Sequence, residues 1–500
     1  MQASIYNSTP DNFNFGGGSQ DTVMHPAVAV AMAVVIVVML VRPRKSILAP
    51  LFLFLFLVPS GQELYLSGVH LYCSRILILV GCSRLLWTKF SGSGKVLAGG
   101  LNTVDRVFIV WALYRALAGS LLFMQTAATI NQFGFLWDTL GMYFLLRFLI
   151  RDRDDIERLF KVFAFVAIAI AAEMVREHYT HENLFAVIFG GLPARLEVRN
   201  GLLRAQAVFQ HSLMAGTFGA ALFPYFVWLW KGGRSRILGV LGMVASLTIT
   251  LASSVSTPIL AFAAAIGAIC AWPIRKYMSY VRYGFVLALI GLAMVMKAPV
   301  WYLIARIDLV GGSTSYQRAE LIDLFIRHAS DWWLIGTNQN ANWGWDMWDT
   351  TNEYVTEGLR GGIVAFVCLL VLIWLSFRNL SKARKAASAD RNEQWFFWML
   401  WSALFVYCVA FIGVHFFDQT RFAWYALLAV ISASTAALPQ SVPAAIGLET
   451  SGLETSLEPV SPRPAYSPVP VAKAPKERLR PSPRNQFDPP PLYPDRKEGI

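Results

Sequence analysis

Long apolar blocks recur along the chain, and they limit the folds that it can adopt. Each block has about 17 to 25 residues, enough to cross a hydrocarbon core of ~30 Å as a helix that rises ~1.5 Å per residue. Hydrophobic residues make up 56% of the 500 residues, and only 15% are charged, whereas soluble globular chains have about 25% charged residues. The sequence therefore predicts an all-α fold, a polytopic transmembrane bundle of about 12 to 13 spans.

The apolar blocks predict thirteen spans, which lie approximately at 26–41, 46–60, 65–82, 106–124, 132–150, 159–175, 207–230, 237–252, 257–273, 282–298, 361–377, 395–414 and 422–438. Lys and Arg gather in alternate connections, at 42–45, 83–105, 151–158, 231–236, 274–281 and 378–394. By the positive-inside rule these connections are cytoplasmic. The N-terminus is then outside, the C-terminus is cytoplasmic, and two long loops, 176–206 and 299–360, are external.

Three parts of the chain differ in composition. An external N-terminal segment, 1–25, precedes the transmembrane domain, 26–438, and a Pro-rich tail, 439–500, follows it. The tail has few aromatic residues and is expected to be disordered and cytoplasmic. It could bind a cytoplasmic partner as polyproline II, or serve only as a tolerated extension. The formal charge of +12 lies mostly in membrane-flanking loops, so it does not indicate nucleic-acid binding.

The two external loops hold the polar side chains that are suited to chemistry. All of their basic residues are arginines, and a guanidinium binds phosphate oxygens in bidentate fashion; they are Arg176, Arg195, Arg199, Arg204, Arg306, Arg318, Arg327 and Arg360. Carboxylates and indoles accompany the arginines in the later loop, as in a sugar site, with tryptophans at Trp332, Trp333, Trp343, Trp345 and Trp348. The alternative is that these tryptophans anchor the protein at the membrane interface.

Placing a charged residue within a membrane span costs free energy, so such residues usually face the interior of the bundle or a water-filled cavity. Arg75 and Arg115 are of this kind, and Glu173 is a possible partner for one of them. The alternative is that the two arginines lie on a substrate path. The cysteines show no paired spacing. His178 and His181 are three residues apart, but no third metal ligand is fixed by spacing. We therefore expect no metal and no cofactor.

Three segments together resemble the O-antigen ligase and polysaccharide polymerase superfamily of bacterial inner membranes. They are Arg204-Ala-Gln-Ala-Val-Phe-Gln-His211, Ser315-Tyr-Gln-Arg318, and Thr351-Asn352-Glu-Tyr354 followed by Glu357 and Gly361-Gly362. The resemblance covers about residues 25–438 and includes the span number and the two external loops. It implies transfer of a saccharide from an undecaprenyl diphosphate carrier to a hydroxyl acceptor on lipid A core or on a growing saccharide.

By this resemblance Arg204 and Arg318 hold the donor diphosphate, and Asn352 orients the acceptor or the loop. Many members have His where this chain has Thr351, and threonine is no general base near neutral pH. Asp349 is the candidate that could replace this histidine as general base. The absence of the histidine from this chain favours a polymerase over a lipid A core ligase. The remaining candidates, expected to bind substrate or to replace that base, are Arg195, Arg199, His211, His328, Trp345, Glu353 and Glu357.

Two other functions remain open. A transporter or flippase of lipid-linked saccharides would use the same arginines without chemistry, although no paired, broken helices indicate inverted repeats. A membrane scaffold would act through the tail, and deletion of 439–500 would distinguish it from an enzyme or a transporter.

Overall fold

The computed structural model describes residues 22–66, 69–92, 96–192, 196–306 and 315–436. The chain divides into two units, Met1–Pro439 and Gln440–Ile500. Most of the predicted N-terminal segment 1–25 and the whole predicted tail 439–500 lie outside the described residues, so the account below concerns the first unit.

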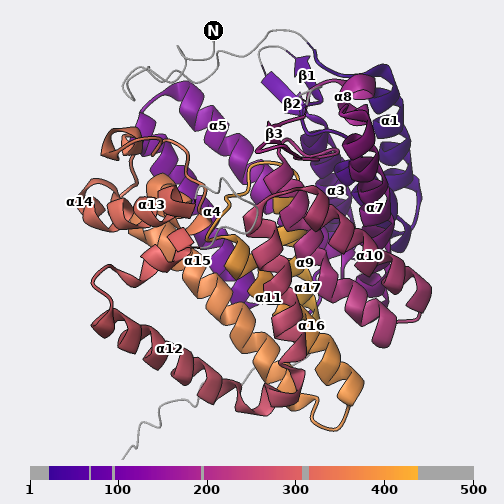
Figure 1. Ribbon diagram of the computed structural model, residues 1–500. Helices are drawn as coiled ribbons and strands as arrows, with labels where there is room; N and C mark the ends of the chain where they lie inside the picture. The colour runs from indigo at the N-terminus through magenta and orange to yellow at the C-terminus, as the bar shows by residue number, and fades with distance from the viewer. Residues whose placement is uncertain (1–21, 67–68, 93–95, 193–195, 307–314, 437–500) are drawn as a thin grey trace, which may run out of the picture. The chain divides into compact units, whose positions relative to one another are not determined.

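The described chain is mostly helical, and every expected span contains a helix (Figure 1). The helices of the first half are α1 (Pro26–Val41), α2 (Leu48–Leu57), α3 (Cys73–Phe90), α4 (Thr103–Phe123), α5 (Thr126–Leu136), α6 (Met142–Leu149), α7 (Arg153–Thr180) and α8 (Leu184–Phe189). Those of the second half are α9 (Ser212–Lys231), α10 (Arg236–Ala252), α11 (Ser256–Cys270), α12 (Met278–Val295), α13 (Ser315–Arg327), α14 (Ala329–Trp332), α15 (Glu353–Ala386), α16 (Arg391–Ala410) and α17 (Thr420–Thr435). A π-helical turn, η3 (Trp137–Gly141), joins α5 to α6, and short 3-10 helices occur at η2 (Arg44–Ser46), η4 (Trp272–Tyr277), η5 (Val300–Arg306) and η6 (Asn340–Trp343).

The expected span 65–82 is wrong over its first half. Strand β1 (Glu63–Leu66) pairs antiparallel with β2 (Val69–Tyr72), and α3 starts only at Cys73. The hairpin brings the Glu63 carboxylate within 3.2 Å of His70 Nδ1. These polar side chains can therefore interact in the hairpin, whereas the expected span would carry His70 into the bilayer.

The expected span 207–230 also begins too early. Ala207 has a φ of +48°, outside the helical region, and α9 begins at Ser212 after His211, whose Nδ1 accepts a hydrogen bond from the backbone N–H of Leu213. This side-chain cap fixes where the helix starts.

Helix α15 begins at Glu353, eight residues before the expected span 361–377, and bends at Gly361 and Gly362. Gly362 has a φ of +60°, and a Cβ there would lie 2.3 Å from the carbonyl oxygen of Leu334. Only glycine suits such a site, where the conformation is left-handed and another backbone approaches closely. The bend thus lets the late loop pack on α15.

The late loop, 299–360, has a small apolar core of its own. The core residues are Leu321, Phe325, Trp332, Met347, Val355 and Leu359. The rings of Phe325 and Trp332 stack with centroids 3.9 Å apart, and Trp332 is buried. Trp332 is therefore a packing residue, neither an interfacial anchor nor a sugar platform.

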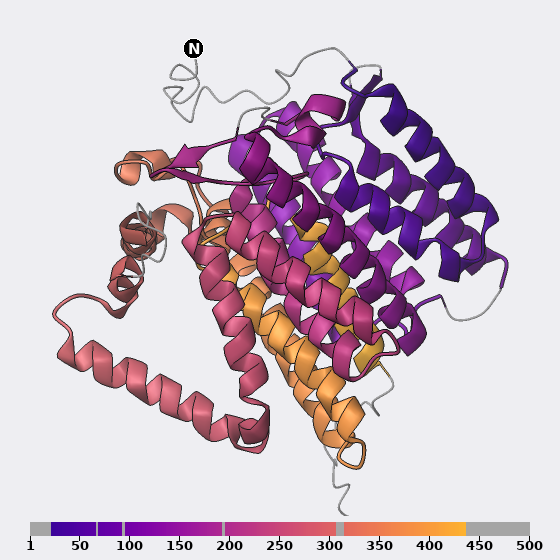
Figure 2. The ribbon, with the colours of Figure 1, turned by 45° about the vertical axis from the view of Figure 1, so that its right-hand side comes forward.

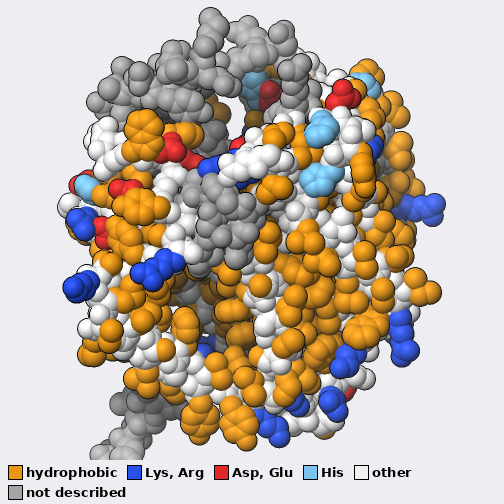
Figure 3. Space-filling model, viewed as in Figure 1, with side chains coloured by type: hydrophobic (Ala, Val, Ile, Leu, Met, Phe, Trp, Pro, Cys, Tyr) orange, Lys and Arg blue, Asp and Glu red, His pale blue; other side chains and the backbone are white. Residues whose placement is uncertain are grey.

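Four helices of the described chain are long and apolar enough to cross a membrane, in the segments Thr103–Phe123, Ser212–Lys231, Trp272–Val295 and Glu353–Ala386. Figure 3 shows hydrophobic side chains over most of one face, with Lys and Arg along its lower edge. Helix α12 stands apart from the bundle (Figure 2), and none of its residues is buried. This exposed apolar surface shows that the chain associates with a membrane; the thirteen-span topology stays a prediction.

Candidate functional site

A cavity of about 380 Å³ lies where four segments distant in sequence meet. The first runs from 197 to 214, the second is residues 254–256 at the start of α11, the third belongs to the late loop, and the fourth is the connection between α16 and α17. The lining residues are Glu197, Arg199, Arg204, His211, Leu213, Met214, Ser254, Val255, Ser256, Arg318, Trp348, Asp349, Thr351, His415 and Phe417. The cavity contains five of the predicted site residues: Arg199, Arg204, His211, Arg318 and Asp349.

A short β-hairpin places two of the arginines. Strand β3 (Val198–Arg199) pairs with β4 (Leu202–Leu203) through Asn200 and Gly201, which have φ values of +51° and +76°. Asn-Gly with two positive φ values is the favoured two-residue hairpin turn. Arg204, directly after β4, lies 3.2 Å from a carboxylate oxygen of Glu197. The hairpin therefore brings Arg199 and an ion-paired Arg204 to the cavity wall.

Arg318 comes from α13 and forms no ion pair among the described residues. Its side chain is buried, and its Nε has no hydrogen-bond partner among the described residues. Burial lowers its pKa to about 10; Asp349 opposes this effect, and Arg204 and Arg199 add to it. The guanidinium remains charged at neutral pH beside two like charges. A bound anion would offset this repulsion and accept a hydrogen bond from Nε–H.

Asp349 faces Arg318 from the late loop. Burial raises the pKa of Asp349 and the neighbouring Asp346 raises it further, whereas Arg318 lowers it. Trp348 beside it lines the cavity, while the predicted Trp345 lies outside the cavity and is 92% exposed. The indole available for stacking on a sugar ring in the cavity is therefore that of Trp348.

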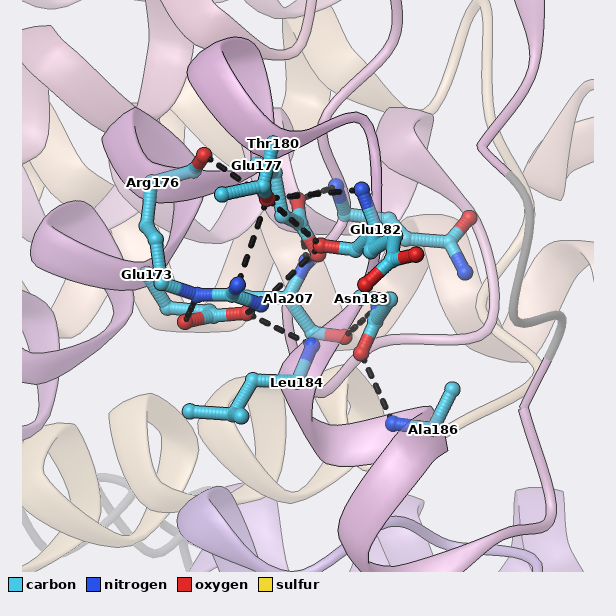
Figure 4. Close-up of polar contacts among 10 residues, drawn as sticks. Glu173, Arg176, Glu177, Thr180, Glu182, Asn183, Leu184, Ala186 and Ala207 are labelled. Atoms are coloured by element: carbon cyan, nitrogen blue, oxygen red, sulfur yellow. Dashed lines mark hydrogen bonds and ion pairs between the residues drawn. The ribbon is translucent and has the colours of Figure 1, made fainter.

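A buried carboxylate at the end of α7 holds the segment that carries Arg204 and His211 (Figure 4). Glu177 accepts hydrogen bonds from the backbone N–H groups of Gln206 (2.8 Å) and Ala207 (3.0 Å). Asn183 donates to the carbonyl oxygen of Ala207 at 2.7 Å. These bonds satisfy backbone groups in a segment without regular structure, so Glu177 and Asn183 position the cavity wall.

Figure 4 also shows Glu173, whose predicted pairing with Arg75 or Arg115 is wrong. Glu173 binds Arg176 in bidentate fashion, with N–O distances of 2.7 and 2.8 Å. Arg75 pairs with Asp138 at 3.1 Å, and Arg115 pairs with Glu357 at 3.0 Å. Glu357 also accepts a hydrogen bond from the indole of Trp111. Glu357, predicted to bind substrate, is thus engaged inside the bundle.

Asn352 and Glu353 lie at the start of α15 and hold the connection between α16 and α17. Asn352 caps α15 by accepting from Val355 N, and its Nδ2 donates to the carbonyl oxygen of Ile412 at 3.0 Å. Glu353 accepts from Phe416 N at 3.0 Å, and its own backbone N–H donates to the carbonyls of Phe411 and Val414. Neither side chain lines the cavity. Asn352 therefore holds the connection between α16 and α17, and its predicted role toward the acceptor or the late loop stays a prediction.

Like Glu197, His415 is one of the cavity residues that the sequence interpretation missed. It lies on the connection that Asn352 and Glu353 hold, and its ring forms a hydrogen bond with the backbone of Thr350. The available signal was weak: one histidine in a short connection, His415-Phe-Phe-Asp418, between two expected spans.

Of the two remaining predicted residues, the structure describes only His328. His328 Nδ1 donates a hydrogen bond to the carbonyl oxygen of Leu324, and the ring stacks on Trp343 with centroids 4.9 Å apart, outside the cavity. Arg195 lies outside the described residues. Within the described chain there is no group of three or more His, Cys, Asp or Glu that could hold a metal ion.

No protein-family model matches the chain, and no curated protein matches it either.

Proposed function

We propose that this chain is a polytopic membrane glycosyltransferase that uses an undecaprenyl diphosphate-linked oligosaccharide as donor. It transfers the saccharide to a hydroxyl of a saccharide or lipid A core acceptor, in exopolysaccharide or O-antigen assembly. The observation that carries the proposal is the cavity in which Arg318, without a hydrogen-bond partner for its Nε among the described residues, faces Arg199 and Arg204.

The charge of the cavity suits a phosphorylated leaving group. When the glycosidic bond to the carrier breaks, negative charge develops on the diphosphate, and guanidinium groups already in place stabilise that charge most strongly. Arg204 is held by Glu197, and Arg318 is held by burial. The indole of Trp348 and the apolar Phe417 provide the surface on which a sugar ring can lie.

The same proposal places the protein in the bacterial inner membrane as a multi-pass protein. Its support is the alternation of basic connections along the sequence, together with the band of exposed apolar side chains (Figure 3). The connections rich in Lys and Arg are cytoplasmic and the C-terminus is cytoplasmic, whereas the N-terminus and the cavity face outward.

A flippase of lipid-linked saccharides would need the same arginines, and its product would be the unchanged carrier on the other side of the membrane. The test must therefore follow the chemical bond as well as the position of the carrier.

The decisive experiment uses the purified full chain with an undecaprenyl diphosphate oligosaccharide and follows product length by gel. We compare the wild type with Arg318→Ala, Arg318→Lys and Arg327→Ala. Arg327 is the matched control, because it lies on the same helix, α13, but its side chain is 70% exposed and pairs with Asp323 at 2.7 Å.

We expect Arg318→Ala to lower kcat/KM by about ten- to hundred-fold, since a charge-assisted hydrogen bond contributes ~1.5–3 kcal/mol. Arg318→Lys should recover little, because an ammonium lacks the bidentate fork, and Arg327→Ala should behave as wild type. Full activity of a correctly inserted Arg318→Ala protein would show that Arg318 does not bind the donor diphosphate. If the carrier instead crosses proteoliposome membranes intact, the protein is a flippase and not a glycosyltransferase.

A further inference from the structure

A hydroxyl acceptor loses its proton when it attacks the sugar, so the cavity should contain a group that can take this proton. Four cavity side chains have a suitable type: Glu197, His211, Asp349 and His415. The existing contacts of Glu197 and His211 exclude these two, whereas Asp349 faces the cation of Arg318 and is compared with His415 in the test below.

Glu197 and His211 are already engaged. Both carboxylate oxygens of Glu197 accept from Arg204, at 3.2 and 3.3 Å. His211 Nδ1 accepts from the backbone N–H of Leu213 at 3.0 Å, so a neutral His211 carries its proton on Nε2, 4.0 Å from Glu197. The ring therefore has no vacant nitrogen with which to receive another proton.

His415 has the opposite arrangement. Its hydrogen bond with the Thr350 backbone raises the pKa of the ring, so the ring is the donor and the backbone carbonyl is the acceptor. A neutral imidazole that donates from one nitrogen has a bare lone pair on the other. Nothing else in the described chain is hydrogen-bonded to the ring, which is half-buried in the cavity wall together with Arg318 and Thr351.

Hydrogen bonds hold the backbone segment that carries His415. Asn352 and Glu353 fix the backbone on both sides of it, at Ile412 and Phe416, with hydrogen bonds of 3.0 Å each. Glu353 N adds bonds to Phe411 and Val414, and the Tyr354 hydroxyl donates to the carbonyl oxygen of Cys408. A catalytic base has to be held in this way by neighbouring hydrogen bonds.

We infer that His415 is the general base of the reaction, supplied by the connection between α16 and α17, and that Asn352 and Glu353 are its positioning residues. This inference rests on the proposed glycosyl transfer. The acceptor oxygen forms a bond to the anomeric carbon while the bond from that carbon to the phosphate oxygen breaks. The diphosphate leaves with the electron pair beside Arg318, and the acceptor proton passes to the free nitrogen of His415.

The charges around His415 give this role a pH signature. In the free protein the pKa of His415 is lowered to about 4, mainly by burial and also by Arg360 from α15 and Arg115 from α4, while the Thr350 bond opposes them. Across the cavity Arg318 and Arg204 are also positive, while Asp349 and Glu197 are negative. A bound diphosphate adds negative charge and raises the pKa towards the operating pH, where a base is most effective.

The test measures transfer from an undecaprenyl diphosphate oligosaccharide against pH, with the purified full chain. The variants are His415→Asn and His415→Gln, which retain an N–H donor for Thr350, His415→Ala with and without added imidazole, and Asp349→Asn. His178→Asn is the control, because His178 is an exposed histidine at the end of α7.

We expect His415→Asn and His415→Gln to lower kcat by about 10²- to 10⁴-fold with little change in KM. Added imidazole should restore part of the activity of His415→Ala. It should not change the activity of His178→Asn. In the wild type the acid limb of kcat should lie at higher pH than that of kcat/KM, since the first reports the bound state.

Wild-type-like kcat in His415→Asn, or loss of the acid limb only in Asp349→Asn, would overturn the inference and leave the glycosyltransferase intact. A wild type that never cleaves the carrier would instead remove the proposed function itself.

Discussion

Two buried arginines show how different the roles of one residue type can be. Arg147 is fully buried, and it binds Asp105 at 3.0 Å and the carbonyls of Ala98 and Gly100. Arg318 is also buried, but two like charges, Arg199 and Arg204, act on it, and its Nε has no hydrogen-bond partner among the described residues. A buried ion without partners is costly unless a ligand supplies them. Arg147 therefore stabilises the fold, whereas Arg318 is available for binding.

Glu177 gives a prediction about stability and pH. It lies beyond the expected span 159–175, and burial raises its pKa to about 7, against the two backbone hydrogen bonds that lower it. A raised pKa means that the folded state favours the protonated acid. Its contribution to stability is complete below pH ~4.5 and is lost as the pH rises through ~7, on the order of 3 kcal/mol.

Glu177→Gln should therefore flatten the decline of the thermal midpoint between pH 5 and 8, because one amide oxygen can still accept from Gln206 and Ala207. Thermal unfolding in detergent measures this, with the exposed Glu182→Gln as control. An unchanged pH slope in Glu177→Gln would show that this carboxyl does not ionise over the range.

The sequence could predict individual site residues only where their chemistry was concentrated. Eight arginines in two loops pointed to phosphate, and the structure brings three of them, Arg199, Arg204 and Arg318, into one cavity. It could not predict His415, because the Asn352 bond that holds its connection joins residues 60 positions apart. Contacts at that separation leave no periodic signal in one sequence.

At the scale of elements, hydropathy predicted where helices exist better than where they start. The start of α9 is set by the His211 cap, and the start of α15 by the Asn352 cap. Each boundary depends on one polar side chain next to an apolar run. Polar pairing likewise turned the first half of the expected span 65–82 into a hairpin.

The requirement for glycine at the bend of α15 can be tested by adding one methyl group at Gly362. Gly362→Ala should lower stability by ~2 kcal/mol or more, because its φ is positive and the new Cβ would meet the Leu334 carbonyl. The late loop would then lose its packing on α15, so transfer activity should fall as well. Thermal unfolding and the gel assay measure the two effects.

The matched control is Gly267→Ala in α11, where a Cβ would meet nothing within 4 Å. This change should be neutral or stabilising by up to ~1 kcal/mol, since alanine favours a helix over glycine. Equal effects at the two glycines would show that the close approach at Gly362 does not constrain the bend.

For the whole molecule, exposed apolar surface is the dominant property. Helix α12 has apolar side chains all around it and none buried, and such a helix is stable only where lipid or another apolar surface surrounds it. Residues 254–256, at the start of α11, line the cavity, whereas the basic turn η4 follows the end of the same helix. The cavity and the basic turn are thus at opposite ends of α11, as the proposed outward-facing site requires.

Removing residues 439–500 should leave glycosyl transfer unchanged, because every cavity residue lies before the tail. The gel assay on the truncated and full-length proteins, at matched insertion levels, measures this. Loss of activity in a stably inserted truncation would favour the scaffold hypothesis, in which the tail recruits a cytoplasmic partner.

The order in which the cavity residues follow one another has a consequence for biogenesis. The hairpin with Arg199 is translated about midway through the chain, Arg318 follows more than a hundred residues later, and His415 enters with the last pair of helices. Chains emerge from the ribosome N-terminus first. A nascent chain could thus present its first cations at the membrane well before it has a base, so an incompletely synthesised protein would have no means of consuming the carrier.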